Sequence, residues 1–316
     1  MTGYIIRRLG QAVIVTIGVT IICFILLHTI PTDKLAHEII GPRATPDQIN
    51  AFISQYGLNR PIWVQYLKFL NQLLHGNLGY SYHLDKPVNL ILRQSLPKDL
   101  LLGGISLFLA TAIAIPVGIA QAVRRNSVLD YAGTTTSFIL YAVPQYLLGV
   151  FLVIVFAEHW KLFPGEVGQD AQTVSGMLEH PENLVLPVAT LTLSIYAFYS
   201  RYMRSSAIDT LAQDYMRTAR AKGLPERLIL ARHLLRNSLI AVVTLIGLSI
   251  PGILTAGLIV EQVFNYPGVG YLYYQASVSS DFSEMLGITV VVGIVTVLGN
   301  LAADIGYAIL DPRIRY

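Results

Sequence analysis

The chain has 316 residues, of which 53% are hydrophobic and only 13% are charged. A soluble globular protein carries about 25% charged residues, so this composition is typical of a membrane protein and excludes a disordered chain and most soluble enzymes. The formal net charge of +3 gives no global basic field that would attract nucleic acid. The single cysteine, Cys23, excludes an internal disulfide framework and a thiolate-rich metal site.

Six stretches of the chain are apolar and long enough to cross a membrane as helices, because a bilayer core needs roughly 20 apolar residues. They cover residues 9–30, 100–123, 132–157, 184–200, 238–260 and 285–310. The first follows Arg7 and Arg8 as a signal peptide would, but its apolar run is too long and no small-residue cleavage site follows it. We therefore expect a retained first helix and predict an all-α polytopic membrane protein with six transmembrane helices.

The positions of Lys and Arg indicate which loops face the cytoplasm, because cytoplasmic loops are enriched in both. With the N-terminus inside, the inner segments hold Arg7, Arg8, Arg124, Arg125, the arginine-rich loop 201–237 and two arginines of the tail. The outer segment 158–183 holds one Lys against five acidic residues. The sequence therefore predicts that both termini are cytoplasmic.

The outer segment 31–97 contains two amphipathic runs. The first begins with Thr45-Pro46-Asp47-Gln48, which is typical of a helix start with a capping box, and it is placed to end at Gly57. The second covers residues 63–74 and is stopped by Gly76. We expect these extracytoplasmic helices to lie on the membrane surface or to cap the bundle, either as a structural lid or as a docking platform for a partner.

The inner segment 201–237 is too polar to span a membrane and too regular to be a linker. Residues 209–222 favour a helix, with acidic residues early and basic residues late, as the helix dipole prefers. Gly223 is placed to end this helix, and residues 226–236 predict a second helical run. Small side chains at Ala219 and Ala221 would let another surface come close, and the neighbouring arginines suit an acidic groove. A generic positive-inside loop would explain the arginines but not this helix–Gly–helix pattern.

Few side chains in the predicted spans are ionisable. His28 lies near the outer edge, and Asp304 lies near the inner end, where a structural hydrogen bond is favoured over a proton relay. Other residues are polar or flexible enough to line a wet path through the membrane, although helix packing would also explain them. These candidates for the substrate path are Tyr141, Gln145, Tyr146, Tyr196 and Gly252.

A Gly/Pro-rich stretch follows the fifth span and is expected to fold back at the outer rim. Its candidate residues for an outer gate or docking site are Glu261, Asn265, Pro267 and Gly268, and a rigid loop without such a role is equally compatible with the sequence. Neither a phosphate-binding Gly-x-x-x-x-Gly-Lys-Ser/Thr loop nor a His-Glu-x-x-His metal motif occurs in the chain. We therefore expect no enzymatic chemistry, no catalytic residue and no metal site in this chain.

The inner loop resembles the coupling loop of permease subunits of ATP-driven (ABC) importers, which has the form Glu-Ala-Ala, three residues, Gly. It is most similar to the dipeptide/oligopeptide/nickel branch, whose loop reads Asp-Tyr-x-Arg-Thr-Ala-Arg-Ala-Lys-Gly-Leu. The matching residues here are Asp214, Tyr215, Arg217, Thr218, Ala219, Arg220, Ala221, Lys222, Gly223 and Leu224. Residues 4–9, 56–61, 65–67, 76–81, 233–237, 261–270 and 311–316 also resemble that branch. Residues 31–34, 98–99 and 280–281 depart from its pattern, which puts substrate and partner details in question rather than the class.

This resemblance implies a subunit with no cofactor of its own, assembled in a prokaryotic inner membrane with a second, similar permease, two ATP-binding subunits and an extracytoplasmic binding protein. ATP and magnesium would bind to the partner ATPase subunits, membrane lipid would surround the helices, and nucleic acid would play no part. The resemblance further implies import of dipeptides or oligopeptides. The chain would consist of a first helix in residues 1–30, an extracytoplasmic segment 31–97 and a five-helix core 98–316 with the coupling loop 201–237.

Three alternatives stay open from the sequence. A permease of the same branch for a nickel chelate or a small oligosaccharide would share these motifs, although clustered metal ligands are missing from the spans. An ion-coupled secondary transporter would predict ionisable groups near the midplane and internal repeats, neither of which the sequence shows. A membrane-embedded receptor or scaffold would use the loop to bind a partner without transport.

Overall fold

The computed structural model describes residues 2–28, 40–41, 44–81, 83–249, 252 and 257–310. Apart from one two-stranded antiparallel hairpin, its regular elements are helices. In chain order they are α1 (Thr2–His28), α3 (Pro46–Tyr56), α4 (Ile62–Leu74), β1 (Tyr80–Ser81), β2 (Lys86–Pro87), α5 (Val88–Val123), α6 (Val128–Ala142), α7 (Gln145–Leu152), η1 (Val153–His159), η2 (Gln169–Ala171), α8 (Val174–Glu179), α9 (Glu182–Leu211), α10 (Asp214–Ala221), α11 (Glu226–Leu228), η3 (Ile229–Leu235), α12 (Arg236–Ser249), α13 (Leu258–Val263), α14 (Val269–Val278) and α15 (Phe282–Leu310). Two of the short elements, η1 and η3, are π-helices.

Five helical segments of the described chain are long and apolar enough to cross a membrane, and a sixth is added if a bent helix pair counts as one span. The five are Ile6–Leu26, Val88–Val123, Glu182–Leu211, Glu226–Gly247 and Phe282–Leu301. This confirms the predicted all-α polytopic class. An α-helix satisfies its backbone hydrogen bonds internally, which is why helices can cross a bilayer core that contains no water.

The predicted third span, 132–157, is divided into two helices that are bent against each other. α6 ends at Ala142 and α7 starts at Gln145, and the two are bent by 103°. Pro144 explains the break, because it lacks a backbone N–H and disfavours helical geometry in the residue before it. Val143 is accordingly extended, with φ −74° and ψ 125°.

The predicted fourth span, 184–200, is too short, because α9 continues without interruption for 30 residues from Glu182 to Leu211. The inner segment 201–237 therefore begins as a continuation of a membrane helix. The single helix predicted for 209–222 is divided at Ala212 and Gln213, and Gln213 is extended with ψ 148°. The length of α9 and the position of the break that follows it depend on packing between helices, and sequence periodicity alone does not reveal that packing.

Several predictions fall where the structure gives no description. The predicted fifth span, 238–260, is helical as far as Ser249, and residues 250–251 and 253–256 lie outside the described residues. Segments 31–34 and 311–316 also lie outside them, as do the side chains of His28 and Asp304.

Contacts divide the chain into two compact units, one formed by Met1–Pro97 with Pro267–Tyr316 and the other by Lys98–Tyr266. The boundary at Pro97 falls inside α5. Each unit is described by itself below. The predicted division into a first helix, an extracytoplasmic segment and a five-helix core stays a prediction.

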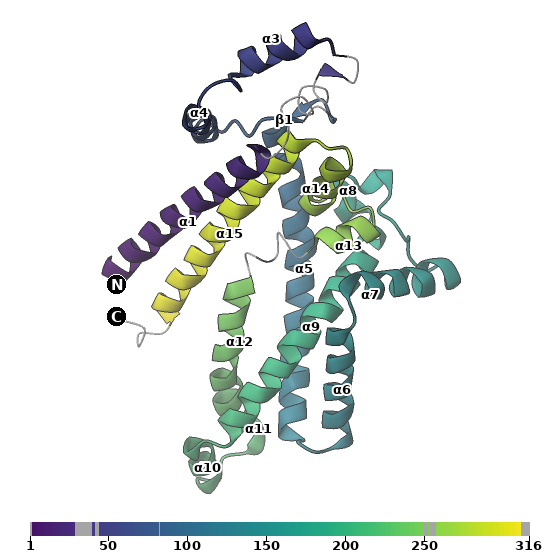
Figure 1. Cartoon of the computed structure of the whole chain (residues 1–316). Coiled ribbons are helices and arrows are strands. Elements are labelled where there is room, and N and C mark those ends of the chain that lie inside the picture. Colours follow the sequence, from purple (N-terminus) through teal and green to yellow (C-terminus); the bar gives the residue numbers. More distant parts are fainter. Residues whose placement is uncertain are drawn as a thin grey trace. The chain divides into compact units, whose positions relative to one another are not determined.

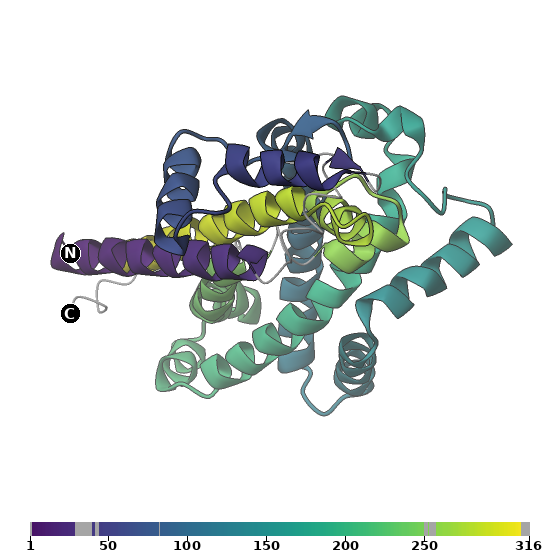
Figure 2. The same cartoon turned by 45° about the horizontal axis from the view of Figure 1, so that its top comes forward.

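In the first unit, α1 and α15 pack side by side along their length, and the start of α1 lies at the same end of the pair as the end of α15 (Figures 1 and 2). The opposite end of α1 meets α4. There, the Thr20 and Tyr66 hydroxyls are 3.0 Å apart and the Phe24 ring packs edge-on against Tyr66 at 5.2 Å. The α3–α4 segment is thus attached to the end of α1 away from the N-terminus.

The predicted signals for the start and end of α3 are confirmed. Thr45 and Gln48 form both hydrogen bonds of a capping box, Pro46 is the first helical residue, and Gly57 ends the helix in the left-handed conformation with φ +71°. In the same unit, the hydroxyl of Ser81 lies 2.7 Å from an Asp281 oxygen and 2.9 Å from a Glu284 oxygen. These buried contacts attach the hairpin to the start of α15.

The second unit is organised around α9. α5 approaches α9 so closely at Gly118 that a Cβ added there would lie 2.7 Å from the Met203 Cβ and 2.9 Å from the Ser200 carbonyl oxygen. A glycine is therefore required by space at this crossing. Next to it, Tyr199 and Met203 are buried in a cluster with Ala114 and Val242, which joins α5, α9 and α12.

A buried ion pair fixes α6 against α9. The guanidinium of Arg204 donates from Nε to Asp130 Oδ1 at 2.6 Å and from Nη2 to Oδ2 at 2.8 Å, and Asp130 is 2% exposed. Asp130 also accepts from the Asn126 backbone N–H at 3.0 Å. Removing one partner of such a pair costs about 3–5 kcal/mol, because the other charge stays buried without compensation.

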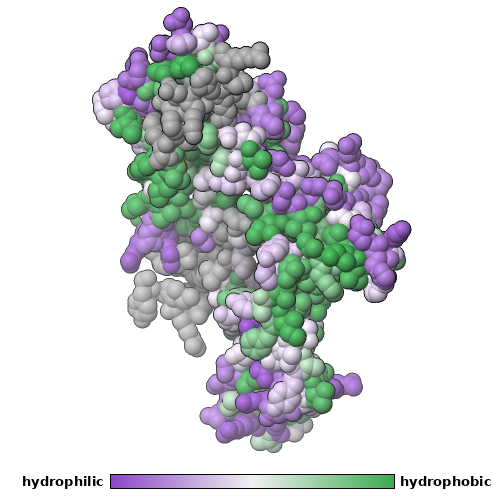
Figure 3. All heavy atoms as spheres, turned by 45° about the vertical axis from the view of Figure 1, so that its right-hand side comes forward, coloured by the Kyte–Doolittle hydropathy of each residue, from purple (hydrophilic) through white to green (hydrophobic). Residues whose placement is uncertain are grey.

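Large apolar side chains cover much of the outer surface of these helices. Ile14 on α1 and Phe108 on α5 are each 70% exposed, and Ile240 on α12 is 62% exposed. On the face shown in Figure 3, hydrophobic residues form a band over the second unit, and hydrophilic residues gather at the end where α10 lies in Figure 1. Such contiguous apolar surface is expected where lipid, rather than water, covers the protein.

The close contact at Gly118 gives a stability prediction. We expect Gly118→Val to force α5 and α9 apart and to destabilise the detergent-solubilised protein by about 1–3 kcal/mol, as overpacking of a core does. Gly104→Val on the same helix is the matched control, because no atom lies within 4 Å of a Cβ built at Gly104. Thermal unfolding of both variants checks this. Equal melting temperatures for the two variants would contradict it.

Candidate functional site

The predicted coupling loop folds as a short helix that packs against one end of the second unit. In α10, Met216 and Ala219 are buried, three residues apart on one face. They pack in a cluster with Ala207 of α9 and Ile229 of η3. The cluster also includes Ala122, Leu234 and, at its edge, Leu224. This contact joins α10 to α5, α9 and η3 in one apolar core.

The remaining residues of the predicted loop face outward. Asp214, Tyr215, Arg217, Thr218, Arg220, Ala221, Lys222 and Gly223 are exposed. Arg217 is 76% exposed and lies 3.7 Å from Asp214. Ala221 is thus available to a partner as the sequence predicted, whereas Ala219 faces the protein's own core. Met216 was not identified from the sequence, although an apolar residue three positions before Ala219 on an otherwise polar helix is a signal for it.

Gly223 ends the loop helix for a conformational reason. Its φ is +73°, in the left-handed region, and its N–H donates to the Arg220 carbonyl at 2.9 Å. Leu224 donates to the Ala219 carbonyl at 3.4 Å and returns its side chain to the apolar cluster. The Arg220 guanidinium donates to Glu226 at 2.9 Å, and this partner raises the pKa of Arg220. The turn after α10 is therefore closed by both backbone and side-chain contacts.

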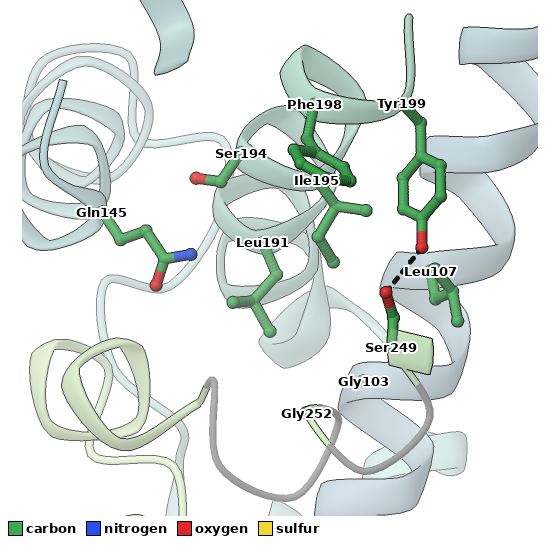
Figure 4. A pocket seen from close by; sticks show the side chains of 10 residues that line it. All are labelled: Gly103, Leu107, Gln145, Leu191, Ser194, Ile195, Phe198, Tyr199, Ser249 and Gly252. Carbon is green, nitrogen blue, oxygen red and sulfur yellow. Dashed lines mark hydrogen bonds between the residues drawn. The ribbon is translucent and has the colours of Figure 1, made fainter. Parts of the chain in front are cut away.

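A cavity of about 280 Å³ lies in the second unit between α5, α7, α9 and the segment after α12. Figure 4 shows its lining, which is mostly apolar. The lining residues are Gly103, Leu107, Gln145, Leu191, Ser194, Ile195, Phe198, Tyr199, Ser249 and Gly252. On α9 they recur at helical spacing, so one face of this helix forms a wall of the cavity.

Polar groups of the cavity lie on separate elements. The Tyr199 and Ser249 hydroxyls are 2.7 Å apart and link α9 to α12, and Ser249 also donates to the Leu245 carbonyl at 2.9 Å. Gln145, at the start of α7, extends toward the helix that carries Leu191 (Figure 4). The cavity thus combines apolar walls with a few polar groups, which is the usual composition of a site for a small organic molecule.

The structure brings together two of the five predicted substrate-path residues. Gln145 and Gly252 line the cavity. Tyr141 and Tyr146 are 59% and 51% exposed and are outside its lining, and Tyr196 packs beside the buried cluster around Met203. Their roles as path residues stay predictions.

The sequence did not identify the other cavity residues. Ser194, Tyr199 and Ser249 line it together with apolar side chains of α5 and α9. A small hydroxyl at Ser194, within the run of apolar residues on one face of α9, was the available signal. It is weak, because serine in a membrane helix usually bonds to its own backbone, as Ser194 does here with the Thr190 carbonyl at 3.1 Å.

The predicted rim residues of the second unit are held firmly. Glu261 on α13 is 2% exposed. Asn265 has φ +48° and donates to Glu166 at 2.7 Å. The Tyr266 hydroxyl donates to the Lys98 carbonyl at 2.6 Å, and burial together with the nearby Asp99 and Glu261 carboxylates raises its pKa.

Pro267 and Gly268 belong to the first unit, where Gly268 directly precedes α14. A role of the four residues as an outer gate or docking site stays a prediction. For a metal, the described residues contain no group of three or more His, Cys, Asp or Glu side chains that could hold an ion.

The left-handed turn at Gly223 gives a second prediction. Because nothing lies within 4 Å of a Cβ built there, Gly223→Ala is strained by its backbone alone, by about 1–2 kcal/mol. We expect this variant to loosen the turn and to speed hydrogen exchange of the backbone amides at positions 223 and 224. Gly223→Asn is the control, since asparagine tolerates this conformation better. Equal exchange rates in the two variants would show that the turn is not held by its φ angle.

Comparison of the sequence with known proteins identifies the family. Residues 114–316 match the family described as binding-protein-dependent transport system inner membrane component, and residues 1–103 match its N-terminal family. The chain is 38% identical over 317 residues to the oligopeptide transport system permease protein AppB of Bacillus subtilis, with all of both chains covered. It is 31% identical to the dipeptide transport system permease proteins DppB of Lactococcus lactis, again over the full length of both, and of Escherichia coli K12, over 99% of that protein. The chain therefore belongs to the family of inner membrane components of binding-protein-dependent transport systems.

Proposed function

We propose that this chain is the permease subunit of an ATP-driven importer of dipeptides or oligopeptides. The observation that carries the proposal is the full-length match to oligopeptide and dipeptide permeases, joined to a matching coupling loop that is exposed at one end of the second unit. Because these relatives are named as peptide permeases, nickel chelates, oligosaccharides and ion-coupled transport are not favoured.

The proposed partners follow from what the chain carries and what it lacks. Its sequence contains no phosphate-binding loop, so ATP and magnesium would bind to two separate ATPase subunits. The exposed basic face of α10, with Arg217 and Lys222, suits an acidic groove on such a subunit. A second, similar permease would complete the path, and an extracytoplasmic binding protein would deliver the peptide, in line with the family description. This chain would then itself catalyse no reaction.

The packing of α10 supports a mechanism for coupling. When the ATPase subunits close, they would move α10, and Met216 and Ala219 would transfer the movement to the inner end of α9. α9 is one uninterrupted helix, and its upper part forms a wall of the cavity. A displacement at α10 would therefore change the cavity about two to four helical turns away along α9. Alternating access would follow from two arrangements of the same helices.

The family places the chain in an inner membrane, and we propose that both termini face the cytoplasm. Two observations support this orientation. The start of α1 and the end of α15 lie at the same end of their helix pair. The arginine-rich segments, including Arg124 and Arg125, lie in the loops predicted to be cytoplasmic.

The proposed function is tested by purifying the chain from its native membrane in mild detergent and identifying what stays bound by mass spectrometry. We expect two P-loop ATPases, a related permease and a binding protein. The reconstituted complex is expected to accumulate a radiolabelled tripeptide in liposomes only when ATP and the binding protein are present. Purification of the chain alone, together with uptake that follows an ion gradient rather than ATP, would contradict the proposal.

The coupling role of the loop is tested in the same liposomes with Gly223→Val, whose β-branched side chain disfavours φ +73°. We expect ATP hydrolysis to continue while peptide uptake per ATP falls several-fold, because α10 no longer transmits its movement. Gly104→Val, which is far from the loop in sequence, serves as control. Unchanged uptake per ATP in the Gly223 variant would remove the lever role of the loop.

A further inference from the structure

The two arginines of α9, Arg201 and Arg204, are arranged differently. Arg201 lies ten residues before the end of the helix at Leu211, which is about 15 Å along its axis. Its Nε donates to the Ala197 carbonyl at 3.1 Å, one turn earlier. The side chain therefore points away from the α10 end of the helix and toward the middle of the span.

Two aromatic rings hold Arg201 in this position. The guanidinium carbon lies 4.0 Å from the centre of the Tyr141 ring and 5.1 Å from the centre of the Phe138 ring, both on α6. A guanidinium stacks on rings through its flat face and donates hydrogen bonds from its edge. The stacking therefore covers the face and leaves the two terminal nitrogens free to bind at the edge.

Arg201 has no acidic partner in the described part of the chain. Its neighbour Arg204, one turn further along α9, is fully paired with Asp130, whereas no carboxylate of the described residues lies within ion-pair distance of Arg201. Arg201 falls within the candidate span Glu182–Leu211 rather than in the loop where the sequence placed it. A charged group there is expensive unless it meets an opposite charge, so an unmatched one points to a ligand. A carboxylate fits this planar guanidinium group, because its two oxygens can accept hydrogen bonds from the two terminal nitrogens.

The position of Arg201 is next to the cavity. Phe198, three residues earlier on α9, and Gln145, four residues after Tyr141, both line it. α9 thus supplies both part of the cavity wall and the arginine, while Gln145 is the first residue of α7, directly after the bend that follows α6. The cavity of about 280 Å³ therefore begins one helical turn from Arg201, at Phe198.

We propose that Arg201, stacked on Tyr141, binds the C-terminal carboxylate of the peptide during its passage, while the adjacent cavity accepts an apolar side chain. This inference rests on the proposed function, because it names the part of the peptide that the path recognises. It assigns Tyr141 to positioning the arginine rather than to lining the cavity. A lipid phosphate fits less well, because the side chain turns away from the α10 end.

The experiment uses the complete reconstituted importer with its binding protein. Uptake of a tripeptide with a free C-terminal carboxylate is compared with uptake of the same tripeptide as a C-terminal amide, in wild type, R201Q, R201K and Y141L. The binding protein is the same in every sample, so its own preference cancels when the acid-to-amide ratio of a variant is divided by that of wild type. R125Q removes one exposed positive charge elsewhere and serves as matched control.

We expect R201Q to lower the acid-to-amide ratio about tenfold or more, as the loss of a charge-assisted hydrogen bond does. R201K should retain part of the ratio, Y141L should lower it less than R201Q, and R125Q should leave it unchanged. Because R201K and Y141L keep the charge, they test the proposal even if R201Q assembles poorly.

Two results would overturn the inference. Equal slowing of acid and amide in R201Q would indicate that Arg201 pairs with another subunit. The second result has two parts: the acid-to-amide ratio of R201Q stays at the wild-type value, and omission of anionic lipid slows uptake by wild type but not by R201Q. Together these would identify a lipid phosphate as the ligand. If wild type takes up neither peptide with ATP, the proposed function fails first and this inference with it.

Discussion

The rest of the arrangement depends on α9 being one continuous helix of 30 residues. Its N-terminal part forms a wall of the cavity, its middle crosses α5 at Gly118, and its C-terminal end packs on α10. A helix transmits displacement along its axis because each turn is hydrogen-bonded to the next. Any break in α9 between Phe198 and Leu211 would separate the cavity from the loop, and the chain places neither glycine nor proline there.

Two kinds of contact hold α9, and they differ in how much relative movement of the helices they allow. The apolar contact with α10 is made by small or flexible side chains such as Ala207 and Met216, which slide at low cost. The Arg204–Asp130 pair is directional and fixes the register of α6 on α9, although desolvation offsets much of its energy. α6 and α9 are thus expected to move together, whereas the π-helix η3 between α10 and α12 provides a segment whose hydrogen bonds are more easily rearranged.

Sequence reasoning predicted the features that are determined locally. Apolar length predicted the spans, Thr45 and Gln48 predicted the cap of α3, and Gly223 predicted the end of the loop helix. It did not predict features that depend on contacts between distant segments. Pro144 indicates a kink in the third span, but the 103° angle between α6 and α7 is not determined locally. The cavity residues Ser194 and Tyr199 could be chosen only after α5, α7 and α12 were placed around α9. Met216 was missed because arginines surround the small apolar face of α10 and dominate the sequence pattern there.

The central claim is that α10 meets an ATPase subunit and carries its movement into the permease. A direct measurement is possible because Cys23 is the single native cysteine of the chain. In a Cys23→Ser background, Arg217→Cys therefore introduces the only thiol of this chain. The assembled complex is treated with a short thiol crosslinker, with and without ATP, beside Arg125→Cys as a matched exposed site. The account predicts a crosslink from position 217 to an ATPase subunit, at a rate that ATP changes, and none from position 125. A crosslink from both positions at the same ATP-independent rate, or none from 217 in an active complex, would contradict it.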